Sequence, residues 1–476
     1  MGNERLIPNL PPEKSPEELR EAIRNRVYVE NYLASFEQYM VNKERTTLLG
    51  RLVRLRKMGK ITFGHLADES GQIQLVFDEK TLQNYPDHIK SLNLGDLILI
   101  NGKAFVTNSG EKSLMCGDFT CLASCSAPLP DKYHGIKDVY TKRKDRILDL
   151  ITNRESFEFF RKASVFVSEL RMNLLRRGFL EFETPILRRK FVAGAAKPFS
   201  TQHDAWGEQA YLRLTSEIEL KQLLVSGYEK VFELGRSFRN EGSDRIHNPE
   251  FMLLEAYQAY ANYRDMMDLT ENLVRSAVLE IFGTLRFVSR AGEVDFSKPW
   301  RVVEANELCF SNICGGANLI EMANMENVRR VAMALGLDIE GLSYGQAISK
   351  FLEIIIQPQV LQPTFIVHLP IEMSPLVSGK PDNPRLAERA WAFAGGIFFC
   401  DIYSDLSDPN ELLQRLKKQD EELGVRGNIS HTDNDLVNAL KYGAPPSAGM
   451  GISIDRLLMV VGGKKHVLDT MLFPNL

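Results

Sequence analysis

The stretch from 231 to 257, VFELGRSFRNEGSDRIHNPEFMLLEAY, constrains the fold of this chain most strongly. Its two ends are rich in β-branched and aromatic residues and flank a polar segment with Gly, Asp, Asn and Pro, which predicts two strands joined by a turn. Because side chains alternate along a strand, we expect Arg239 and Glu241 to share one face. The same alternation predicts one shared face on the return strand for Phe251, Leu253, Glu255 and Tyr257. This spacing fits a charged site and an ordinary exposed hairpin face equally well.

Length and composition define the class of protein. A chain of 476 residues, of which 44% are hydrophobic and 25% charged, is typical of a globular protein with about two to three domains. The net charge is −4, so a nucleic-acid partner would need a local basic patch. No apolar run approaches the roughly 20 residues of a spanning helix, and the N-terminus has no signal-peptide pattern. We therefore expect a cytoplasmic protein with no membrane partner.

The six cysteines are too few for a disulfide scaffold in a chain of this length. Cys116, Cys121 and Cys125 lie close together, but their spacing does not fit a zinc site. We expect ordinary reduced thiols at these positions.

Changes of pattern divide the chain into four parts. Residues 1–45 predict an N-terminal helical extension, because a Pro-rich lead is followed by a charged helical run that Ser15 can cap. Residues 46–128 alternate like short strands, and residues 129–150 form a Pro-led basic connector. The remaining part, residues 151–476, mixes helical and strand patterns.

The second part, with glycines between about five short strands, fits an OB-fold. Such a barrel binds single-stranded nucleic acid by stacking and by polar contacts to base edges. Arg56 belongs to a local basic patch beside Phe63, and Gln74 and Glu111 are candidate base readers. A solvated charged strand edge is the alternative interpretation.

The last part opens with a helix whose apolar residues recur at steps of three and four. Another helix is predicted to open at Ser216, and residues 283–362 are assigned only as mixed helix and loop. Near the C-terminus, TFIVHLP and WAFAGGIFFCDIYSDL predict strands, and APPSAGMGISIDRLL predicts small flexible residues that lead into a helix near Arg456. Gly449 and Gly451 would let a ligand approach the backbone, although such turns are also common without one.

Together these motifs resemble the class II aminoacyl-tRNA synthetases, and most of all their lysyl group. GFLEFETPIL is similar to the first signature of that class, FRNEGSDRIHNPEF to the second, and GMGISIDR to the third. PLPDKYHGIKD followed by YTKRKDRILDLI is typical of the connector in the lysyl group. The resemblance covers the chain from about Thr46 onward. It implies an α+β homodimer in which an N-terminal OB-fold β-barrel binds the tRNA anticodon and a class II catalytic domain has a large antiparallel sheet flanked by helices.

The resemblance also implies a reaction, in which ATP activates lysine and the aminoacyl group passes to tRNA. The amino-acid carboxylate attacks the α-phosphate in line, so positioning and charge supply most of the rate. The position of Arg239 bridges this phosphate and the carboxylate, which suits a forked, permanently charged donor. The other implied ATP contacts are Glu241 to the adenine amino group, Phe251 stacked on adenine, and His247, Asn248 and Arg456 near the outer phosphates.

For the amino acid, the resemblance places Glu217 at the substrate amines and Glu255 and Tyr257 around the ε-ammonium. A buried ammonium requires such an acidic, hydrogen-bonding pocket. Asp401 falls where the substrate carboxylate is contacted, and Asp405 falls where the ε-ammonium is met. On the barrel, the positions implied to read the central anticodon uridine are Phe63, Gln74 and Glu111, with Arg56 as a basic neighbour.

Some residues depart from the pattern of the family. Trp391 and Phe398 fall where two glutamates hold Mg²⁺ on ATP, and aromatic rings cannot ligate a hard cation. No metal ligand is therefore assigned. Asp401 replaces an asparagine and should repel the substrate carboxylate by roughly a few kcal/mol in a dry site. The remaining departures are Asp405 for a glutamate, Val192 and Ala193 for a glycine pair, and Ser453 for a glycine.

Two hypotheses of different class follow. In the first, the chain is an active lysine-tRNA ligase in which Mg²⁺ is held by phosphates, waters or other acids such as Asp401. In the second, it is a synthetase-like paralogue with lost or altered activation, either a tRNA- or nucleotide-binding regulator or a ligase for another cationic amino acid. Arg239, Glu241, Phe251 and Arg456 favour the first hypothesis, whereas the altered residues from 391 to 405 favour the second.

Overall fold

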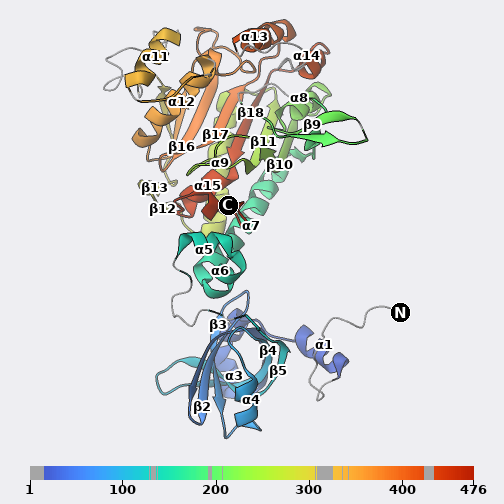
Figure 1. Ribbon diagram of the computed structural model, residues 1–476, viewed down its shortest axis with the longest axis vertical. Helices are drawn as coiled ribbons and strands as arrows, with labels where there is room; N and C mark the ends of the chain where they lie inside the picture. The colour runs from blue at the N-terminus through green and yellow to red at the C-terminus, as the bar shows by residue number, and fades with distance from the viewer. Residues whose placement is uncertain are drawn as a thin grey trace. The chain divides into compact units, whose positions relative to one another are not determined.

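The chain divides into two compact units, Met1–Phe157 and Glu158–Leu476, and each is described by itself (Figure 1). The coordinates are a computed structural model. They describe residues 15–127, 129, 136, 138–190, 196–205, 207–305, 307, 325–334, 336–340, 342, 344–422 and 434–475.

The first unit is built on a closed barrel with strand order β1-β2-β3-β5-β4. The strands are β1 (Arg45–Met58), β2 (Ile61–Ala67), β3 (Gln72–Asp78), β4 (Leu97–Val106) and β5 (Lys112–Ala123). Alternate residues of β2 are buried, as expected for strands that fill a small barrel with one face. The predicted OB-fold is confirmed.

In the described part of the first unit, six short helices accompany the barrel. They are α1 (Pro16–Arg24), α2 (Val29–Ala34), α3 (Phe36–Asn42), α4 (Tyr85–Ser91), α5 (Val139–Lys144) and α6 (Arg146–Thr152). The predicted cap of the first helix is confirmed, because Ser15 and Glu18 form a reciprocal capping box at its start.

The second unit is built on an eight-stranded sheet with order β14-β15-β16-β17-β18-β11-β10-β6. The strands are β6 (Leu180–Glu181), β10 (Lys230–Phe238), β11 (Glu250–Ala259), β14 (Arg301–Glu304), β15 (Thr364–Val367), β16 (Arg389–Ala394), β17 (Ile397–Ser404) and β18 (Ser447–Ser453). The six central strands are antiparallel, but the pairs at both edges, β14 with β15 and β10 with β6, are parallel. The sheet is therefore mixed, because long helical connections between the edge strands permit parallel pairing.

Smaller elements complete this unit. Its helices are α7 (Arg154–Arg176), which spans the division between the units, α8 (Glu217–Val225), α9 (Tyr263–Phe282), α11 (Met325–Ala334), α12 (Tyr344–Ile356), α13 (Pro409–Glu422), α14 (Asn434–Leu440) and α15 (Ile454–Val461). Two small sheets are formed by β12 (Arg286–Ser289) with β13 (Gly292–Asp295), and by β7 (Leu187–Arg188), β9 (Glu208–Leu212) and β8 (Ser200–His203). Much of the region that the sequence left unassigned is thus a hairpin, an edge strand and two helices.

The predicted central hairpin is confirmed, since β10 and β11 pair along their whole length. The glycine-rich segment after Pro446, predicted as flexible, is instead strand β18 between β11 and β17. Alternation along β18 gives its two faces different roles. Met450 and Ile452 pack in the main core, which also contains residues of α9, whereas Gly449 and Gly451 face the other side of the sheet.

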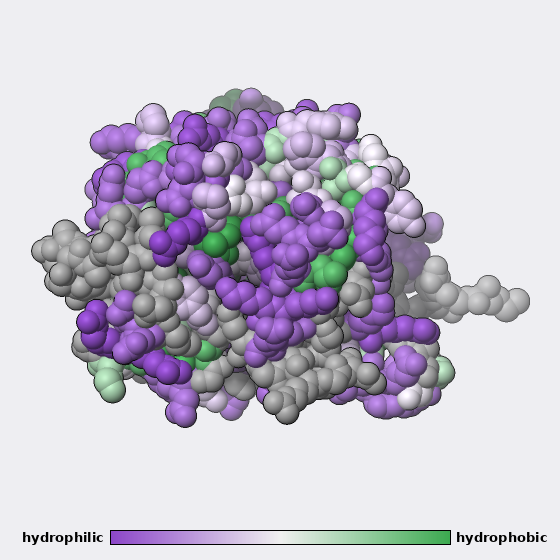
Figure 2. Space-filling model, turned by 90° about the horizontal axis from the view of Figure 1, so that it is seen from above, coloured by the Kyte–Doolittle hydropathy of each residue, from purple (hydrophilic) through white to green (hydrophobic). Residues whose placement is uncertain are grey.

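Among the residues described, no helix is both long and apolar enough to cross a bilayer. Among the coloured residues of the face seen from above, hydrophilic ones predominate, with smaller hydrophobic areas between them (Figure 2).

The two glycines of β18 should respond differently to an added methyl group. A Cβ at Gly449 would lie 2.2 Å from the Tyr257 ring, whereas a Cβ at Gly451 meets nothing closer than Leu253 at 3.9 Å. We expect Gly449→Ala to destabilise the second unit by about 1–3 kcal/mol through overpacking. Gly451→Ala is the matched control and should cost less than about 1 kcal/mol. Thermal melting checks this, and equal losses for both variants would contradict it.

Candidate active site

Several side chains predicted for the site, among them Glu255, Tyr257 and Asp401, lie on one face of the large sheet, opposite α9. Residues that pair directly across strands point to the same side. One row across five strands contains Trp391, Asp401, Gly451, Glu255 and Glu233. The next row, two residues and about 7 Å further along the strands, contains Arg389, Tyr403, Gly449, Tyr257 and Val231.

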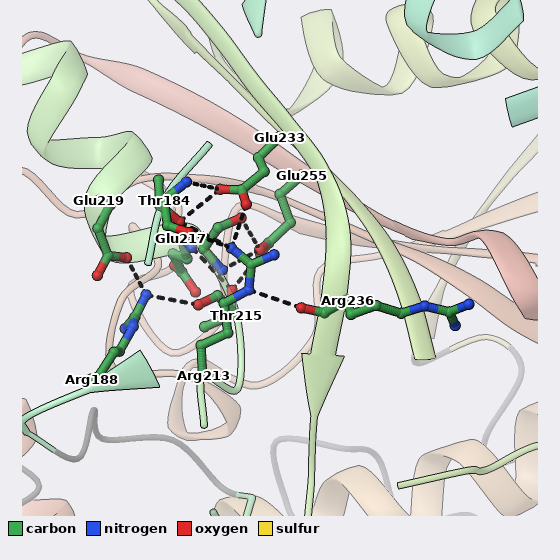
Figure 3. A network of polar contacts seen from close by, with 10 residues as sticks. Thr184, Arg188, Arg213, Thr215, Glu217, Glu219, Glu233, Arg236 and Glu255 are labelled. Carbon is green, nitrogen blue, oxygen red and sulfur yellow. Dashed lines mark hydrogen bonds and ion pairs between the residues drawn. The ribbon is translucent and has the colours of Figure 1, made fainter. Parts of the chain in front are cut away.

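A buried ion pair anchors the β10 side of this face. The Arg213 guanidinium donates to the Glu233 carboxylate, and both side chains are at most 5% exposed. The Thr184 hydroxyl donates to Glu233 at 2.7 Å, and Arg213 Nε donates to the carbonyl oxygen of Arg236 at 2.8 Å. These groups converge in Figure 3, whereas the side chain of Arg236 points away. A Cβ at Gly235 would lie 2.3 Å from a terminal nitrogen of the Arg213 guanidinium, so any other residue would displace Arg213.

Glu255 is held beside this pair by three hydrogen bonds (Figure 3). The hydroxyls of Thr215 and Ser216 and the N–H of Ser216 donate to its carboxylate. Burial raises the pKa of Glu255 against these hydrogen bonds, and nearby Glu217 adds to the increase. A cation placed beside Glu255 would therefore stabilise its ionised form.

Glu217 and Asp405 share one cation, the ammonium of Lys221. Lys221 Nζ lies 2.6 Å from Glu217 Oε1 and 2.7 Å from Asp405 Oδ1, and its side chain is 7% exposed. It also lies 5.1 Å from the ring centre of Tyr403 and 5.7 Å from that of Tyr257. Burial alone would lower the pKa of Lys221, but Asp405 and Glu217 outweigh burial and raise it. We call these five residues the ammonium cage.

Asp401 is paired with Arg389, which the sequence did not reveal. The guanidinium binds the carboxylate through two nitrogens, with Nε 2.8 Å from Oδ1. Arg389 balances the charge of Asp401, which reduces the repulsion expected between Asp401 and a substrate carboxylate. The pairing depends on the register of β16 against β17, in which Arg389 lies opposite Tyr403 and next to the Asp401 row.

The other end of the face, near the start of β11, carries two arginines over aromatic rings. The guanidinium of Arg239 lies 5.1 Å from the ring centre of Phe251, and that of Arg456 lies 5.6 Å from the ring centre of Phe398. Arg456 also donates to the carbonyl oxygens of Ile246 and Phe398, each at 3.1 Å. Burial lowers the pKa of Arg456, and Arg239 adds to the decrease. Two neighbouring cations in this position favour an anionic ligand.

Arg239 and Glu241 do not share a strand face, so that prediction is wrong. Strand β10 ends at Phe238, and the N–H of Glu241 donates to the carbonyl oxygen of Arg239 at 2.8 Å. This tight turn breaks the alternation of a strand and leaves Glu241 exposed.

His247 and Asn248 lie in the same hairpin loop. His247 Nδ1 is 2.8 Å from the Asp244 carboxylate, and the Asn248 side chain donates to the carbonyl oxygen of Glu250 at 2.6 Å. Both contacts order the loop next to Arg239. Val192 and Ala193 lie outside the described residues, and Ser453 caps α15 by accepting a hydrogen bond from the N–H of Arg456.

Trp391 and Phe398 form part of an aromatic cluster. Their ring centres are 5.0 Å apart, and Phe393 lies 5.5 Å from Phe398. The cluster packs against apolar residues of α12 such as Phe351. Within the described ranges, no group of three or more His, Cys, Asp or Glu residues could hold a metal ion. The residues at these two positions do not fit Mg²⁺.

The predicted anticodon residues lie together on the barrel of the first unit. Arg56 and Phe63 are direct partners across β1 and β2, and they line a cavity of about 860 Å³ together with Gln74. Gln74 donates to Glu111 at 2.8 Å. His65 Nε2, 3.6 Å from Glu111, is an additional polar group on this face. Burial and then Arg54 lower its pKa.

Sequence reasoning missed the residues that balance charge in the site. Lys221 had a usable signal, since it follows Glu217 by four residues on a predicted helix, where opposite charges meet. Arg213 and Arg389 had no such signal, because their partners Glu233 and Asp401 lie on other strands and only the register brings each pair together.

The Arg213 and Glu233 pair should be essential to the fold of this face. We expect Arg213→Met to cost about 3–5 kcal/mol, because Glu233 would remain buried without its cation. Arg161→Met is the control, since its pair with Glu158 is 53% and 30% exposed and should contribute at most about 1 kcal/mol. Thermal unfolding of both variants measures the difference. A similar melting temperature for the two would contradict a structural role for the buried pair.

Comparison with known proteins agrees with this geometry. Residues 138–476 match the family model described as tRNA synthetases class II (D, K and N), and residues 46–122 match an OB-fold nucleic acid binding domain. The lysine-tRNA ligase of Chloroflexus aurantiacus is 36% identical over 450 residues, which is 93% of this chain and 91% of that protein. Those of Staphylococcus haemolyticus and Moorella thermoacetica are 37% and 39% identical, over 91% of this chain and 88% and 89% of their own lengths. The chain therefore belongs to the class II tRNA synthetases of the D, K and N group.

Proposed function

We propose that this protein is a lysine-tRNA ligase, which forms lysyl-adenylate from lysine and ATP and transfers the lysyl group to tRNA. The observation that carries the proposal is the distribution of charge along the face of the sheet. Acidic side chains gather at one end and two arginines at the other, so a ligand with amines at one end and carboxylate and phosphates at the other is matched at both ends.

The acidic end carries two more negative charges than positive ones. Asp405 and Glu255 are buried carboxylates and Glu217 is a largely buried one, and Lys221 is the ammonium that pairs with Glu217 and Asp405. Asp401 and Glu233 are excluded from this balance because Arg389 and Arg213 neutralise them. Lysine carries an α-ammonium and an ε-ammonium, and these two charges would balance the site. In this proposal, Glu217 meets the substrate amines, and the ε-ammonium meets Glu255 first, with Tyr257 and Asp405 as its more distant neighbours.

The arginine end would hold ATP. Arg239 would bridge the α-phosphate and the amino-acid carboxylate, because a forked guanidinium can bind both oxyanions at once. Phe251 would stack on adenine and Glu241 would accept from its amino group. The outer phosphates would lie near Arg456, which its contacts to two carbonyl oxygens hold in a fixed position. The remaining loop contacts to these phosphates would be His247 and Asn248.

Catalysis would then follow from position and charge. The lysine carboxylate, held by Arg239, attacks the α-phosphorus in line, the bond to the β-phosphate oxygen breaks, and pyrophosphate leaves with the electron pair. Arg239 stabilises the negative charge that develops on the α-phosphate oxygens. The ribose hydroxyl at the tRNA 3′ end then attacks the mixed anhydride and releases AMP. No protein nucleophile takes part in either step.

We further propose that the side chains at positions 391 and 398 do not bind Mg²⁺ in this protein. The resemblance places metal-binding glutamates there, whereas Trp391 and Phe398 pack against each other with tilted rings. Any Mg²⁺ that accompanies ATP would be held by its phosphates and water. The positive charges of Arg239 and Arg456 would neutralise part of the negative charge of the phosphates.

Three further proposals follow from the assignment. The barrel face would read the lysine anticodon, with a base stacked on Phe63 and its edge read by Gln74 and Glu111, beside Arg56.

A homodimer would cover apolar side chains that are more than 36% exposed on α7 and β6, among them Met172 and Leu180. The protein would act in the cytoplasm, where tRNA is charged.

A second candidate function is a paralogue without lysine activation, which binds nucleotide or tRNA for regulation or charges another amino acid. The aromatic pair of Trp391 and Phe398 favours it, because it removes two carboxylates from the arginine end. The retained arginines and the carboxylates of the ammonium cage favour the ligase.

Lysine-dependent exchange of pyrophosphate into ATP, run beside a panel of other amino acids, tests the ligase. We expect exchange with lysine, and we expect Arg239→Ala to lower kcat/KM by about 10²–10³-fold, as for other groups that stabilise charge in a transition state. Arg236→Ala is the matched control, since this side chain points away from the site (Figure 3) and should change kcat/KM by less than about threefold. No exchange with any amino acid, in folded protein that still binds ATP or tRNA, would contradict the ligase and favour the paralogue.

The aromatic pair can be tested by restoring acids. We expect Trp391→Glu combined with Phe398→Glu to make the exchange rate respond more steeply to Mg²⁺ concentration, because carboxylates would then ligate the ion. Combined Trp391→Gln and Phe398→Gln is the control for the loss of the rings. An unchanged Mg²⁺ response in the acidic variant would show that the two rings are not the cause.

A further inference from the structure

The ammonium cage is complete without a ligand. Two carboxylates and two aromatic rings surround one ammonium, which is the arrangement that binds organic cations. The cation is Lys221 of the chain itself, which reaches Glu217 and Asp405 at 2.6 and 2.7 Å. Asp405 is fixed by the hydroxyl of Ser447 at 2.7 Å. Because nearly all of Lys221 is buried, this cation does not exchange with solvent as a surface lysine would.

The cage stands at the end of the face that is furthest from the arginines. Along β11, Phe251 comes first, then Glu255, and then Tyr257, which belongs to the cage. The Tyr257 row is one row beyond the Glu255 row, or about 7 Å along the strands. Asp405 follows one row later, since its N–H donates to the carbonyl oxygen of Ser447. A ligand anchored at Arg239 and extended along β11 therefore points its far end at Lys221.

We infer that Lys221 is a specificity-determining residue that closes the far end of the amino-acid pocket and limits the length of the diamino acid that the site accepts. This inference rests on the proposed function. A side-chain ammonium that stops near Glu255 meets an uncompensated carboxylate and is attracted. An ammonium carried further meets the ammonium of Lys221, and two like charges in a buried site repel each other strongly.

A series of diamino acids that differ only in length tests the limit. We expect the wild-type protein to bind lysine and to bind homolysine, one methylene longer, at least about tenfold more weakly, as repulsion between like charges requires. In Lys221→Ala, the ratio of the two Kd values should fall to about threefold or less, because the opposing charge and its volume are gone. Isothermal titration calorimetry measures both Kd values, so the result does not depend on turnover.

Two variants separate charge, volume and general damage. Lys221→Met keeps most of the side-chain volume and removes the charge, so it should also relax the ratio, and it carries the comparison if Lys221→Ala does not fold. Lys230→Ala is the matched control, because Lys230 is also partly buried in the second unit but contacts the Arg177 carbonyl oxygen and the Phe179 ring. Its ratio should equal that of the wild type.

Rescue by a small amine tests the cage independently of the substrate. Lys221→Ala removes three carbons and the ammonium, which n-propylammonium supplies. We expect n-propylammonium chloride to raise the melting temperature of Lys221→Ala above that in sodium chloride of equal concentration. Tetramethylammonium, which has no N–H donors, should not do so, and neither the wild type nor Lys221→Met should respond, because the space is filled.

The outcomes distinguish the inference from the proposed function. If wild-type protein binds lysine but the Kd ratio stays unchanged in both Lys221 variants, the length limit is wrong and the ligase proposal stands. If wild-type protein binds no diamino acid, the proposed function fails and the length limit fails with it, whereas rescue by n-propylammonium would still establish the cage as an ammonium site. Absence of that rescue in folded Lys221→Ala would overturn the cage itself.

Discussion

The balance of buried charge is the constraint on which the catalytic unit depends. Five carboxylates, those of Glu217, Glu233, Glu255, Asp401 and Asp405, stand on or beside one face of the sheet. A carboxylate removed from water is destabilised unless a cation or several hydrogen bonds accompany it. Four carboxylates obtain a cation from Arg213, Arg389 or Lys221, and Glu255 obtains hydrogen bonds alone. The polar groups of the site are therefore interdependent, and no single one can be changed without cost to its partner.

The sheet also brings most of these groups together on paired strands instead of on loops. Strand alternation sends Leu254 and Ala256 into the core and Glu255 and Tyr257 to the site. Glycines on the neighbouring strand then remove side chains where space is needed. The space at Gly449 is taken by the Tyr257 ring, whereas at Gly451, between Asp401 and Glu255, a Cβ would make only ordinary contacts. Sites built on paired strands hold their groups more firmly than sites built on loops.

The sequence predicted much of this arrangement, but not which strands pair, in which register they pair, or where a strand ends. The OB barrel, the central hairpin and the shared face of Glu255 and Tyr257 follow from local periodicity, which a sequence displays directly. The partners of Asp401 and Glu233 were not predictable, because Arg389 and Arg213 meet them only through strand register. Glu241 was misplaced because the strand was predicted to run three residues past its end at Phe238. The glycine-rich β18 resembled a loop, since composition cannot reveal that both of its edges are paired.

The distribution of charge along the strands also gives the site a direction. Arg239 and Arg456 mark one end and the ammonium cage marks the other, and both ends are fixed to the same sheet face. A zwitterionic ligand turned end for end would place its carboxylate against Glu217 and Asp405 and its amines against two arginines. Each of those contacts is repulsive in a medium of low dielectric constant. Electrostatics therefore selects the orientation that presents the carboxylate to the nucleotide end, before shape complementarity contributes. The aromatic rings beneath the arginines strengthen this selection by excluding water.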